Sequence, residues 1–187
     1  MSVANRLTLD AYLDLARDDP DGFWELWDGE PREKPSMSWE HDDAMAELGW
    51  MVRNQLDRRQ FRIRIGAGRV LRGEGRAFIP DVFVLPVAYG DGQRGQPGRL
   101  EVFPGPLPLV VEVWSLSTGQ YDRSVKLQTY RERGDAEIWL LHTYERSLTR
   151  WVRQPDGTYA EETFAGGRVE LVGLPGVVVD LDALFAE

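Results

Sequence analysis

The sequence predicts an α/β domain in which a mixed β-sheet is flanked by helices. Short apolar runs have the length and composition of buried strands, and other segments place apolar residues at helical spacing. A helix expected over residues 123–133 lies between two of the apolar runs, as in a β-α-β crossover. The chain has 187 residues, enough for one substantial core, and we expect residues 1–187 to form a single domain.

Helices are predicted where apolar residues recur at helical spacing after a residue that can cap the first turn. Thr8 is suited to cap the first helix, which ends before Asp19-Pro20. Ser38 is suited to cap the longest one, whose inward stripe includes His41 and Leu48. The expected helices cover residues 9–17, 39–58, 123–133 and 180–185.

Strands are predicted from alternation or from short, almost wholly apolar runs. Residues 61–65 alternate apolar side chains with arginines, which indicates a half-buried strand, whereas residues 109–114 indicate a strand buried on both faces. Residues 66–75 suggest a short hairpin arm, and residues 86–108, with five prolines and five glycines, a long irregular loop. The expected strands cover residues 23–27, 30–34, 61–65, 78–85, 109–114, 136–142, 147–153, 158–163 and 168–172, the last ones adding a C-terminal hairpin.

Composition excludes several classes of function. The chain has no cysteine, so disulfides, thiolate zinc sites and cysteine nucleophiles are excluded. No stretch approaches the ~20 apolar residues of a membrane span, and no apolar run follows a basic start. We therefore expect a cytoplasmic protein without a membrane association.

The net charge of −9 is unevenly distributed. Residues 10–47 hold thirteen acidic residues against three basic ones, a local charge of −10, which leaves +1 for the rest. Residues 53–76 hold eight arginines against two acidic residues, among them Arg62, Arg64 and Arg69. These three arginines are our candidates for contacts with a nucleic-acid backbone, although a solvated strand face would have the same composition.

Two carboxylates interrupt apolar, strand-like runs. Glu112 lies in the middle of Leu109-Val110-Val111-Glu112-Val113-Trp114, and Asp81 lies inside residues 78–85. If the two strands are neighbours, their paired side chains begin about 5 Å apart at Cβ. Carboxylates that close repel unless one is protonated or a divalent cation lies between them, and such hard oxygen ligands suit Mg²⁺ or Mn²⁺. The carbonyl of Val113 could provide a further ligand, while a buried ion pair without catalysis remains the alternative.

The helix after the Glu112 strand carries polar residues at i, i+4 and i+8, namely Asp122, Lys126 and Tyr130. These side chains share one stripe, and the helix can pack back over the face that carries Glu112. Lys126 could then orient or activate a water molecule, or neutralise charge on a phosphate. The alternative is an ordinary solvated lysine.

An ordered series of motifs carries a family resemblance. The series is Trp24-Glu25-Leu26-x-Asp28-Gly29-Glu30, Ser38-x-x-His41, Pro80-Asp81-Val82, Val110-Val111-Glu112-Val113-x-Ser115-x-Ser117-Thr118, Asp122…Lys126…Tyr130 and Glu137-Ile138-Trp139. It resembles the bacterial Uma-two family of restriction endonuclease-like proteins, within the PD-(D/E)XK nuclease superfamily, over about residues 6–153. The resemblance implies a restriction endonuclease-like core and a metal site. It also places Glu25 and His41 near that site.

One departure from the superfamily pattern concerns catalysis. The superfamily has a lysine two residues after the glutamate, and this position is Trp114 here. Lys126 could supply the amine from the next helix instead. We therefore expect a Mg²⁺- or Mn²⁺-dependent endonuclease acting on DNA, with Asp81, Glu112 and Lys126 as its catalytic residues. The alternative is an inactive module that binds DNA or a protein, and in either case we expect a homodimer.

Overall fold

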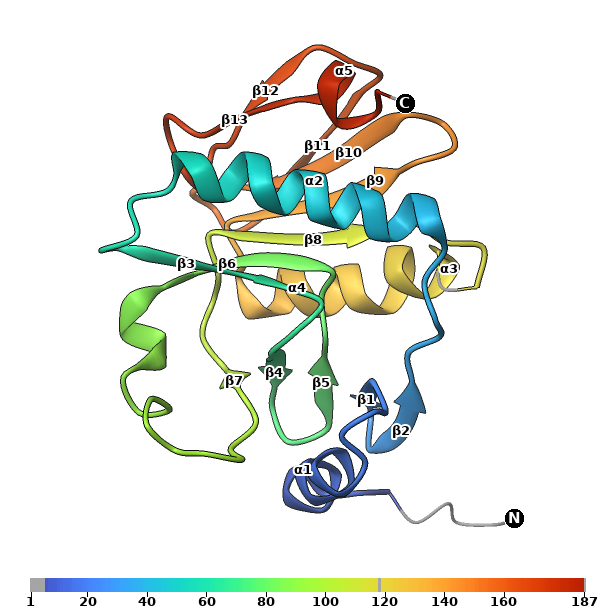
Figure 1. Cartoon of the computed structure of the whole chain (residues 1–187), viewed down its shortest axis with the longest axis vertical. Coiled ribbons are helices and arrows are strands. Elements are labelled where there is room, and N and C mark those ends of the chain that lie inside the picture. The colour runs from blue at the N-terminus through green and yellow to red at the C-terminus, as the bar shows by residue number, and fades with distance from the viewer. Residues whose placement is uncertain (1–5, 118, 187) are drawn as a thin grey trace.

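The computed structural model describes residues 6–117 and 119–186 and shows an α+β fold built on two large sheets (Figure 1). Thr118, part of one sequence motif, lies outside the described residues. The six-stranded sheet has the order β11-β10-β9-β8-β6-β3, and the five-stranded sheet has the order β2-β1-β5-β4-β7. A two-stranded sheet, β12-β13, completes the C-terminal part. The sequence predicts one mixed sheet, so the division into separate sheets is a difference.

The six-stranded sheet carries the expected β-α-β crossover. Its strands β8 and β9 are parallel and are joined through α4, while its other neighbours are antiparallel. The two central strands are buried along nearly their whole length, as their apolar sequences predict. The strands are β3 (Phe61–Ile65), β6 (Val82–Pro86), β8 (Leu109–Val113), β9 (Glu137–His142), β10 (Ser147–Arg153) and β11 (Tyr159–Phe164).

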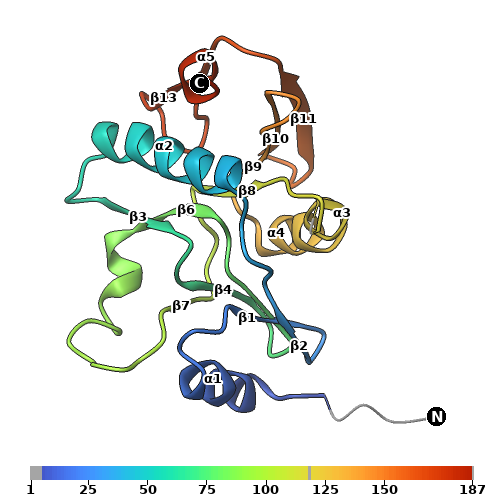
Figure 2. The ribbon, with the colours of Figure 1, turned by 45° about the vertical axis from the view of Figure 1, so that its right-hand side comes forward.

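Helices cover both faces of this sheet, with α2 on one face and α4 on the other (Figures 1 and 2). The long helix α2 (Trp39–Gln55) begins at Ser38, whose side chain accepts a hydrogen bond from the N–H of His41, as expected for a cap. The other face receives α3 (Gly119–Tyr121), the π-helical turn η2 (Asp122–Lys126) and α4 (Leu127–Arg133). Alternation along β8 therefore sends Val111 towards α2 and Val110 towards α4.

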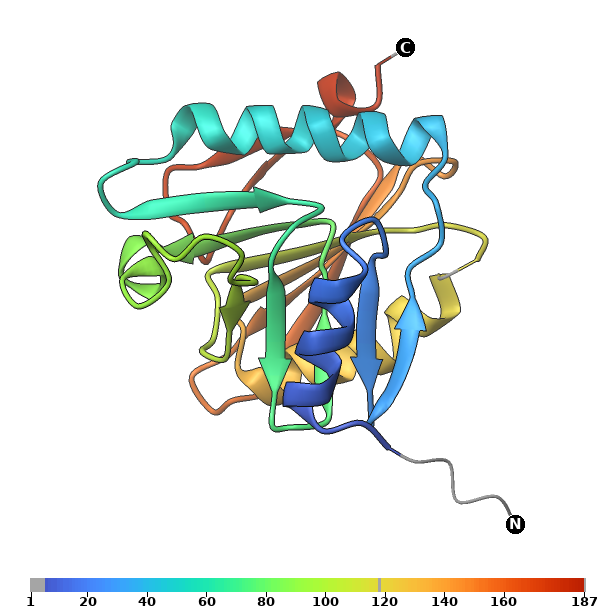
Figure 3. The same ribbon diagram turned by 60° about the horizontal axis from the view of Figure 1, so that its bottom comes forward.

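The five-stranded sheet stands below the larger one, and α1 lies across it (Figure 3). Helix α1 (Leu9–Asp18) packs Tyr12 and Ala16 against Leu26, Leu71 and Ala77 of this sheet. Its strands are β1 (Trp24–Trp27), β2 (Glu30–Glu33), β4 (Arg69–Arg72), β5 (Arg76–Phe78) and β7 (Val102–Phe103). The remaining elements are the short helix η1 (Val87–Gly90), β12 (Arg168–Glu170), β13 (Val178–Asp180) and α5 (Leu181–Leu184).

The predicted strand over residues 78–85 was wrong in one respect that matters for the site. The run is divided between the end of β5 and β6, and Asp81 lies at the bend before β6. Pro80 explains this division, because proline cannot donate a ladder hydrogen bond. The bend lets one short segment join the two large sheets and places Asp81 at their junction.

Candidate active site

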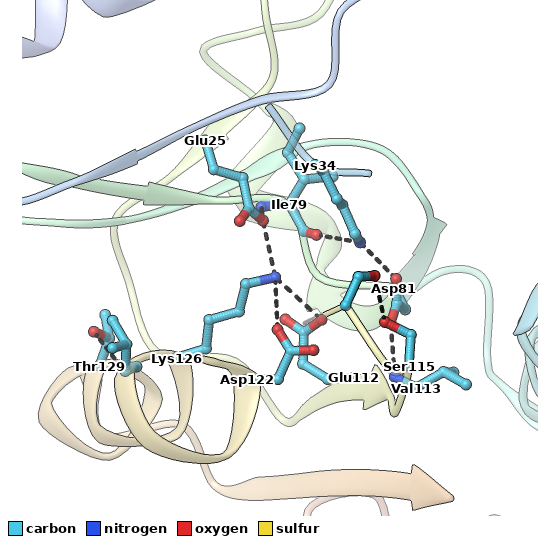
Figure 4. A network of polar contacts seen from close by, with 12 residues as sticks. Glu25, Lys34, Ile79, Asp81, Glu112, Val113, Ser115, Asp122, Lys126 and Thr129 are labelled. Atoms are coloured by element: carbon cyan, nitrogen blue, oxygen red, sulfur yellow. Dashed lines mark hydrogen bonds and ion pairs between the residues drawn. The ribbon is translucent and has the colours of Figure 1, made fainter. Parts of the chain in front are cut away.

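Four carboxylates and two lysine ammonium groups are buried together where the two large sheets meet (Figure 4). The carboxylates, called the carboxylate cluster below, belong to Glu25, Asp81, Glu112 and Asp122. Burying a single unpaired carboxylate is strongly unfavourable, so four of them require compensating charge. Lys34 and Lys126 supply it.

Asp81 receives donors on both of its oxygens. Its Oδ1 lies 2.5 Å from Nζ of Lys34, and its Oδ2 lies 3.2 Å from Nε2 of His41. The backbone N–H of Val113 also donates to Oδ2, at 2.6 Å (Figure 4). This last bond follows from strand pairing: β6 and β8 pair Val82 with Val111, so Asp81 comes opposite Glu112.

Glu112 projects from β8 towards the helix that follows it. Its Oε1 accepts a hydrogen bond from the hydroxyl of Tyr130, and its Oε2 lies 3.3 Å from Nζ of Lys126. Both partners stand on the segment that returns over the sheet, as the i, i+4, i+8 pattern predicts. The π-helical turn that contains Asp122 and Lys126 is a local distortion often found at functional sites.

Lys126 forms ion pairs with three of the four carboxylates in the cluster. Its side chain is 1% exposed, and its ammonium lies 3.0 Å from Glu25, 3.3 Å from Glu112 and 3.3 Å from Asp122. Glu25 comes from β1 of the smaller sheet, and its Oε1 also accepts the backbone N–H of Ile79 at 2.9 Å. One ammonium thus connects the two sheets with the π-helical turn.

The residues expected at the site from the sequence are therefore neighbours in space. Lys126 pairs with Glu112, Asp81 lies opposite Glu112 in the β6–β8 register, and Glu25, His41, Asp122 and Tyr130 each contact one of these three. Val113 takes part through its N–H group on Asp81. Their catalytic and metal-binding roles remain predictions.

The three arginines predicted to contact nucleic acid have different surroundings. The guanidinium of Arg62 donates to backbone carbonyls of Phe61 and Arg58 beside a groove of about 310 Å³. Arg64 is held by Glu101, with Nη2 to Oε1 at 2.6 Å. Arg69 is 8% exposed and donates from Nε to the hydroxyl of Tyr12 at 2.9 Å, so its head group faces the interior.

Sequence reasoning missed Lys34 and Tyr121. Lys34 follows β2 and reaches Asp81 across 47 positions of sequence, a contact that no local pattern reveals. The sequence feature that could have drawn attention to Lys34 is the rarity of lysine, which occurs only at positions 34 and 126. Tyr121 packs its ring edge-on against Trp27 and Phe78, and its buried hydroxyl has no hydrogen-bond partner among the described residues.

Trp114, at the position of the superfamily's lysine, does not join the cluster's ion pairs. Its ring stacks on His142 at a centroid distance of 4.2 Å and an interplanar angle of 18°. Gly119 allows this position, because a Cβ there would clash with the indole nitrogen of Trp114. The ammonium near Glu112 comes from Lys126 instead.

The sequence and the fold were compared with those of known protein families and solved structures. The family described as "Putative restriction endonuclease", Uma2, matches residues 9–182. The chain belongs to the Uma2 family. A crystal structure of a "putative nuclease belonging to DUF820" from Anabaena variabilis has the same fold, with a TM-score of 0.75 at 19% identity. That similarity covers 96% of this chain and 97% of the other. No curated protein matches the sequence.

The two central carboxyls of this Uma2 protein have pKa values displaced in opposite directions. Burial raises the pKa of Glu112 well above 4.5, and the neighbouring charges of Asp122 and Asp81 raise it further against the attraction of Lys126. Burial would also raise the pKa of Asp81, but Lys34, His41 and Lys126 together hold it below its ordinary value. Of the two carboxyls, Glu112 is therefore the one that takes up a proton more readily.

The pKa of Lys126 also departs from that of a free lysine. Burial alone would lower it, yet Glu112, Glu25 and Asp122 together raise it well above 10.5. Lys126 consequently keeps its proton and acts as a positive charge and hydrogen-bond donor. Burial likewise raises the pKa of Tyr130, and its phenol donates to Glu112.

The donor set of the Uma2 cluster fits a divalent cation in charge and in chemistry. Four carboxylates face two ammonium groups, a formal excess of two negative charges that one divalent cation would balance. Carboxylate oxygens from neighbouring strands are the ligands that Mg²⁺ and Mn²⁺ prefer. Within residues 6–117 and 119–186, no trio of His, Cys, Asp or Glu side chains is already arranged as a metal site. Lys34 and Lys126 form ion pairs with carboxylate oxygens that would be the ligands of a cation.

Proposed function

We propose that this protein hydrolyses phosphodiester bonds of DNA as an endonuclease that depends on Mg²⁺ or Mn²⁺. The observation that carries the proposal is the meeting of Asp81, Glu112 and Lys126 in one buried cluster, with Nζ of Lys126 3.3 Å from Glu112. Membership of the Uma2 family and the fold shared with the Anabaena protein support a nuclease. No helix of the described residues is long and apolar enough to cross a membrane.

In this proposal Asp81 and Glu112 hold the cation, together with the carbonyl of Val113. The chemistry that the cation supplies is Lewis acidity towards a phosphoryl oxygen and towards water. His41 and the N–H of Val113 fix one oxygen of Asp81, which leaves the carboxylate a single orientation. Tyr130 fixes Glu112 in the same way, by donating to its Oε1.

Lys126 acts as the positive charge beside the reacting phosphate. Because its pKa is raised, it orients water and offsets charge on phosphoryl oxygens rather than removing a proton. Glu25 and Asp122 hold the ammonium at 3.0 and 3.3 Å, so their part is to position Lys126. A helix-borne lysine thus does the work that the superfamily assigns to the position of Trp114.

DNA would lie along the arginines at the end of α2 and on β3. Arg53, Arg58, Arg62 and Arg64 line a groove of about 310 Å³ with the apolar side chains of Phe61 and Ile63. Arginine contacts to phosphates provide affinity that is independent of sequence and sensitive to salt. Arg62 is the best candidate for a phosphate contact, since Glu101 already holds Arg64 and Tyr12 binds Arg69. Homodimerisation in the cytoplasm is part of the proposal, and light scattering after size exclusion would test the dimer.

The experiment is cleavage of supercoiled plasmid DNA in Mg²⁺, in Mn²⁺ and in chelator. We expect cleavage only with the cations, and a loss of about a hundredfold or more in Asp81→Asn and in Glu112→Gln. Glu145→Gln is the control, since Glu145 is an exposed carboxylate on the β9–β10 turn. Thermal melting verifies that each variant is folded.

Undiminished cleavage in both site variants would refute the assignment of Asp81 and Glu112. If the wild type neither cleaves DNA nor binds Mn²⁺ in a calorimetric titration, the protein is a binding module with the same fold. That alternative has its own structural support, because the lysines already neutralise part of the cluster.

A further inference from the structure

Lysine is used at two positions of this chain, whereas arginine occurs twenty times. Both lysines enter the carboxylate cluster, with side chains 8% and 1% exposed, and surface ion pairs such as Arg17–Asp14 and Arg76–Asp28 use arginine. An ammonium is a compact charge on a flexible stem, whereas a guanidinium is a planar fork that holds a carboxylate at two points. Both lysine ammonium groups of the chain therefore face buried acids, where a compact charge on a flexible stem fits.

Lys34 lies between two elements of the fold. It follows the last residue of β2 and precedes the cap of α2, in a segment without regular structure. Its backbone N–H is fixed to the carbonyl of Phe23 at 2.8 Å, and its ammonium donates to the carbonyl of Ile79 at 3.0 Å. The stem between these points is the four-carbon chain of the lysine itself.

The two oxygens of Asp81 differ in how firmly their partners are held. Oδ2 is bonded by the backbone N–H of Val113, which cannot leave without moving β8, and also by the imidazole of His41 on α2. Oδ1 is bonded by Lys34 at 2.5 Å, and this partner can swing away by side-chain rotation alone. Oδ1 is therefore the oxygen of Asp81 that can change partner.

The charge of the cluster gives a reason for such a change. The four carboxylates of the cluster attract a divalent cation. A cation bound at Oδ1 of Asp81 would lie beside the ammonium of Lys34, whose Nζ is 2.5 Å from that oxygen, and the two positive charges would repel each other.

We propose that Lys34 is a displaceable counter-ion, whose ammonium occupies Oδ1 of Asp81 until a divalent cation takes that oxygen in its place. This inference rests on the proposed function, because it assumes that Asp81 is a ligand of the cation. It makes Lys34 a positioning residue: it keeps the buried carboxylate ionised and aligned while no cation is bound. A lysine with a purely structural part would instead stay on Asp81 whatever the cation concentration.

The first test measures Mn²⁺ binding by isothermal titration calorimetry, without DNA, in the wild type, Lys34→Met and Arg76→Met. Methionine preserves the length of the stem and removes the competing charge. We expect Lys34→Met to bind Mn²⁺ at least about tenfold more tightly than the wild type. Arg76→Met changes the net charge equally by breaking the ion pairs with Asp28 and Glu132, and we expect its affinity to stay within about twofold of the wild type.

The outcomes separate the two hypotheses. Equal or weaker Mn²⁺ binding in Lys34→Met, with a wild type that binds, overturns the displacement and leaves the metal site standing. Absence of binding in both proteins overturns this inference together with the proposed function. If Mn²⁺ binds to Lys34→Met but not to the wild type, the result supports displacement and shows that Lys34 competes for Asp81 more strongly than Mn²⁺ does.

The second test observes the lysine ammonium groups directly. Selective ¹⁵N labelling of lysine yields two side-chain signals, and Lys34→Arg removes one of them and so assigns both. On titration with Mg²⁺ to saturation, we expect the Lys34 signal to shift and to lose its protection from hydrogen exchange. The Lys126 signal should keep its protection, since three carboxylates hold that ammonium. A Lys34 signal that is unchanged at saturation refutes the proposal.

Discussion

Replacing Lys126 by methionine removes the one positive charge that three members of the carboxylate cluster share. The ammonium lies 3.0 Å from Glu25 and 3.3 Å from both Glu112 and Asp122, and its side chain is almost completely buried. Methionine has a similar length, so the apolar contacts of the stem largely remain. The loss is therefore mainly electrostatic.

The expected magnitude follows from burial and from proton uptake. Removing one partner of a buried ion pair costs about 3–5 kcal/mol, because the remaining charge stays buried without compensation. The folded protein can reduce this cost by binding protons at the abandoned carboxylates, and each unit of pKa is equivalent to about 1.4 kcal/mol. We expect a loss of about 3–5 kcal/mol at pH 8 and a loss smaller by at least about 1 kcal/mol at pH 5.

The sign of the pH effect can be worked out from Glu112. Its pKa is already raised well above 4.5 in the folded wild type, and loss of Lys126 raises it further. A group with a raised acidic pKa binds its proton in the folded state first, so stability falls as pH rises from about 4.5 upwards. The variant must therefore lose more stability than the wild type over this range.

The assay is urea unfolding followed by circular dichroism at pH 5 and pH 8. Arg123→Met on the same π-helical turn is the control, because Arg123 is exposed and its replacement should cost no more than about 0.5 kcal/mol. A Lys126→Met variant as stable as the wild type, or a loss that is the same at both pH values, would show that the cluster is not balanced by this lysine.

Two further predictions concern Glu112 and the arginine groove. Glu112→Gln removes the carboxyl whose pKa is raised. The stability of this variant relative to the wild type should therefore improve between pH 5 and pH 8. A difference in the free energy of urea unfolding that is independent of pH would contradict this. Arg62→Ala should weaken duplex binding and reduce the slope of log K against log salt by about 0.9, measured by fluorescence anisotropy, whereas Arg17→Ala on α1 should change neither. An unchanged slope for Arg62→Ala would exclude a phosphate contact there.

Much of the fold could be predicted from local pattern. The cap at Ser38 and the stripe that follows it predicted α2, which ends at Gln55 rather than at residue 58 because the backbone of Leu56 is extended, with φ −77° and ψ 136°. The buried run of β8 and the helix after it predicted the parallel crossover to β9. The strand β13 was missed although it begins within the run Val177-Val178-Val179, because three residues are too few to show alternation.

Some residues of the candidate site could be identified from local sequence pattern, and others could not. Asp81, Glu112 and Lys126 could be found because each departs from its local surroundings, two as acids in apolar runs and one as a lysine on a polar stripe. Lys34 could not be found by position, because its contact with Asp81 joins a hairpin end to a bend 47 residues later. The bend itself was predicted as strand, although Pro80 is the residue that interrupts the ladder.

The sequence by itself determined which groups are candidates for the chemistry: acids placed in strands that would otherwise be apolar, and lysine used twice in a chain rich in arginine. Only the tertiary structure decided the pairing of these groups, with Lys34 on Asp81 and Lys126 among three carboxylates. The physical reason is that burial and charge balance depend on what meets in space. A residue's local pattern sets its own face and element, but not the charge that another sheet brings to it.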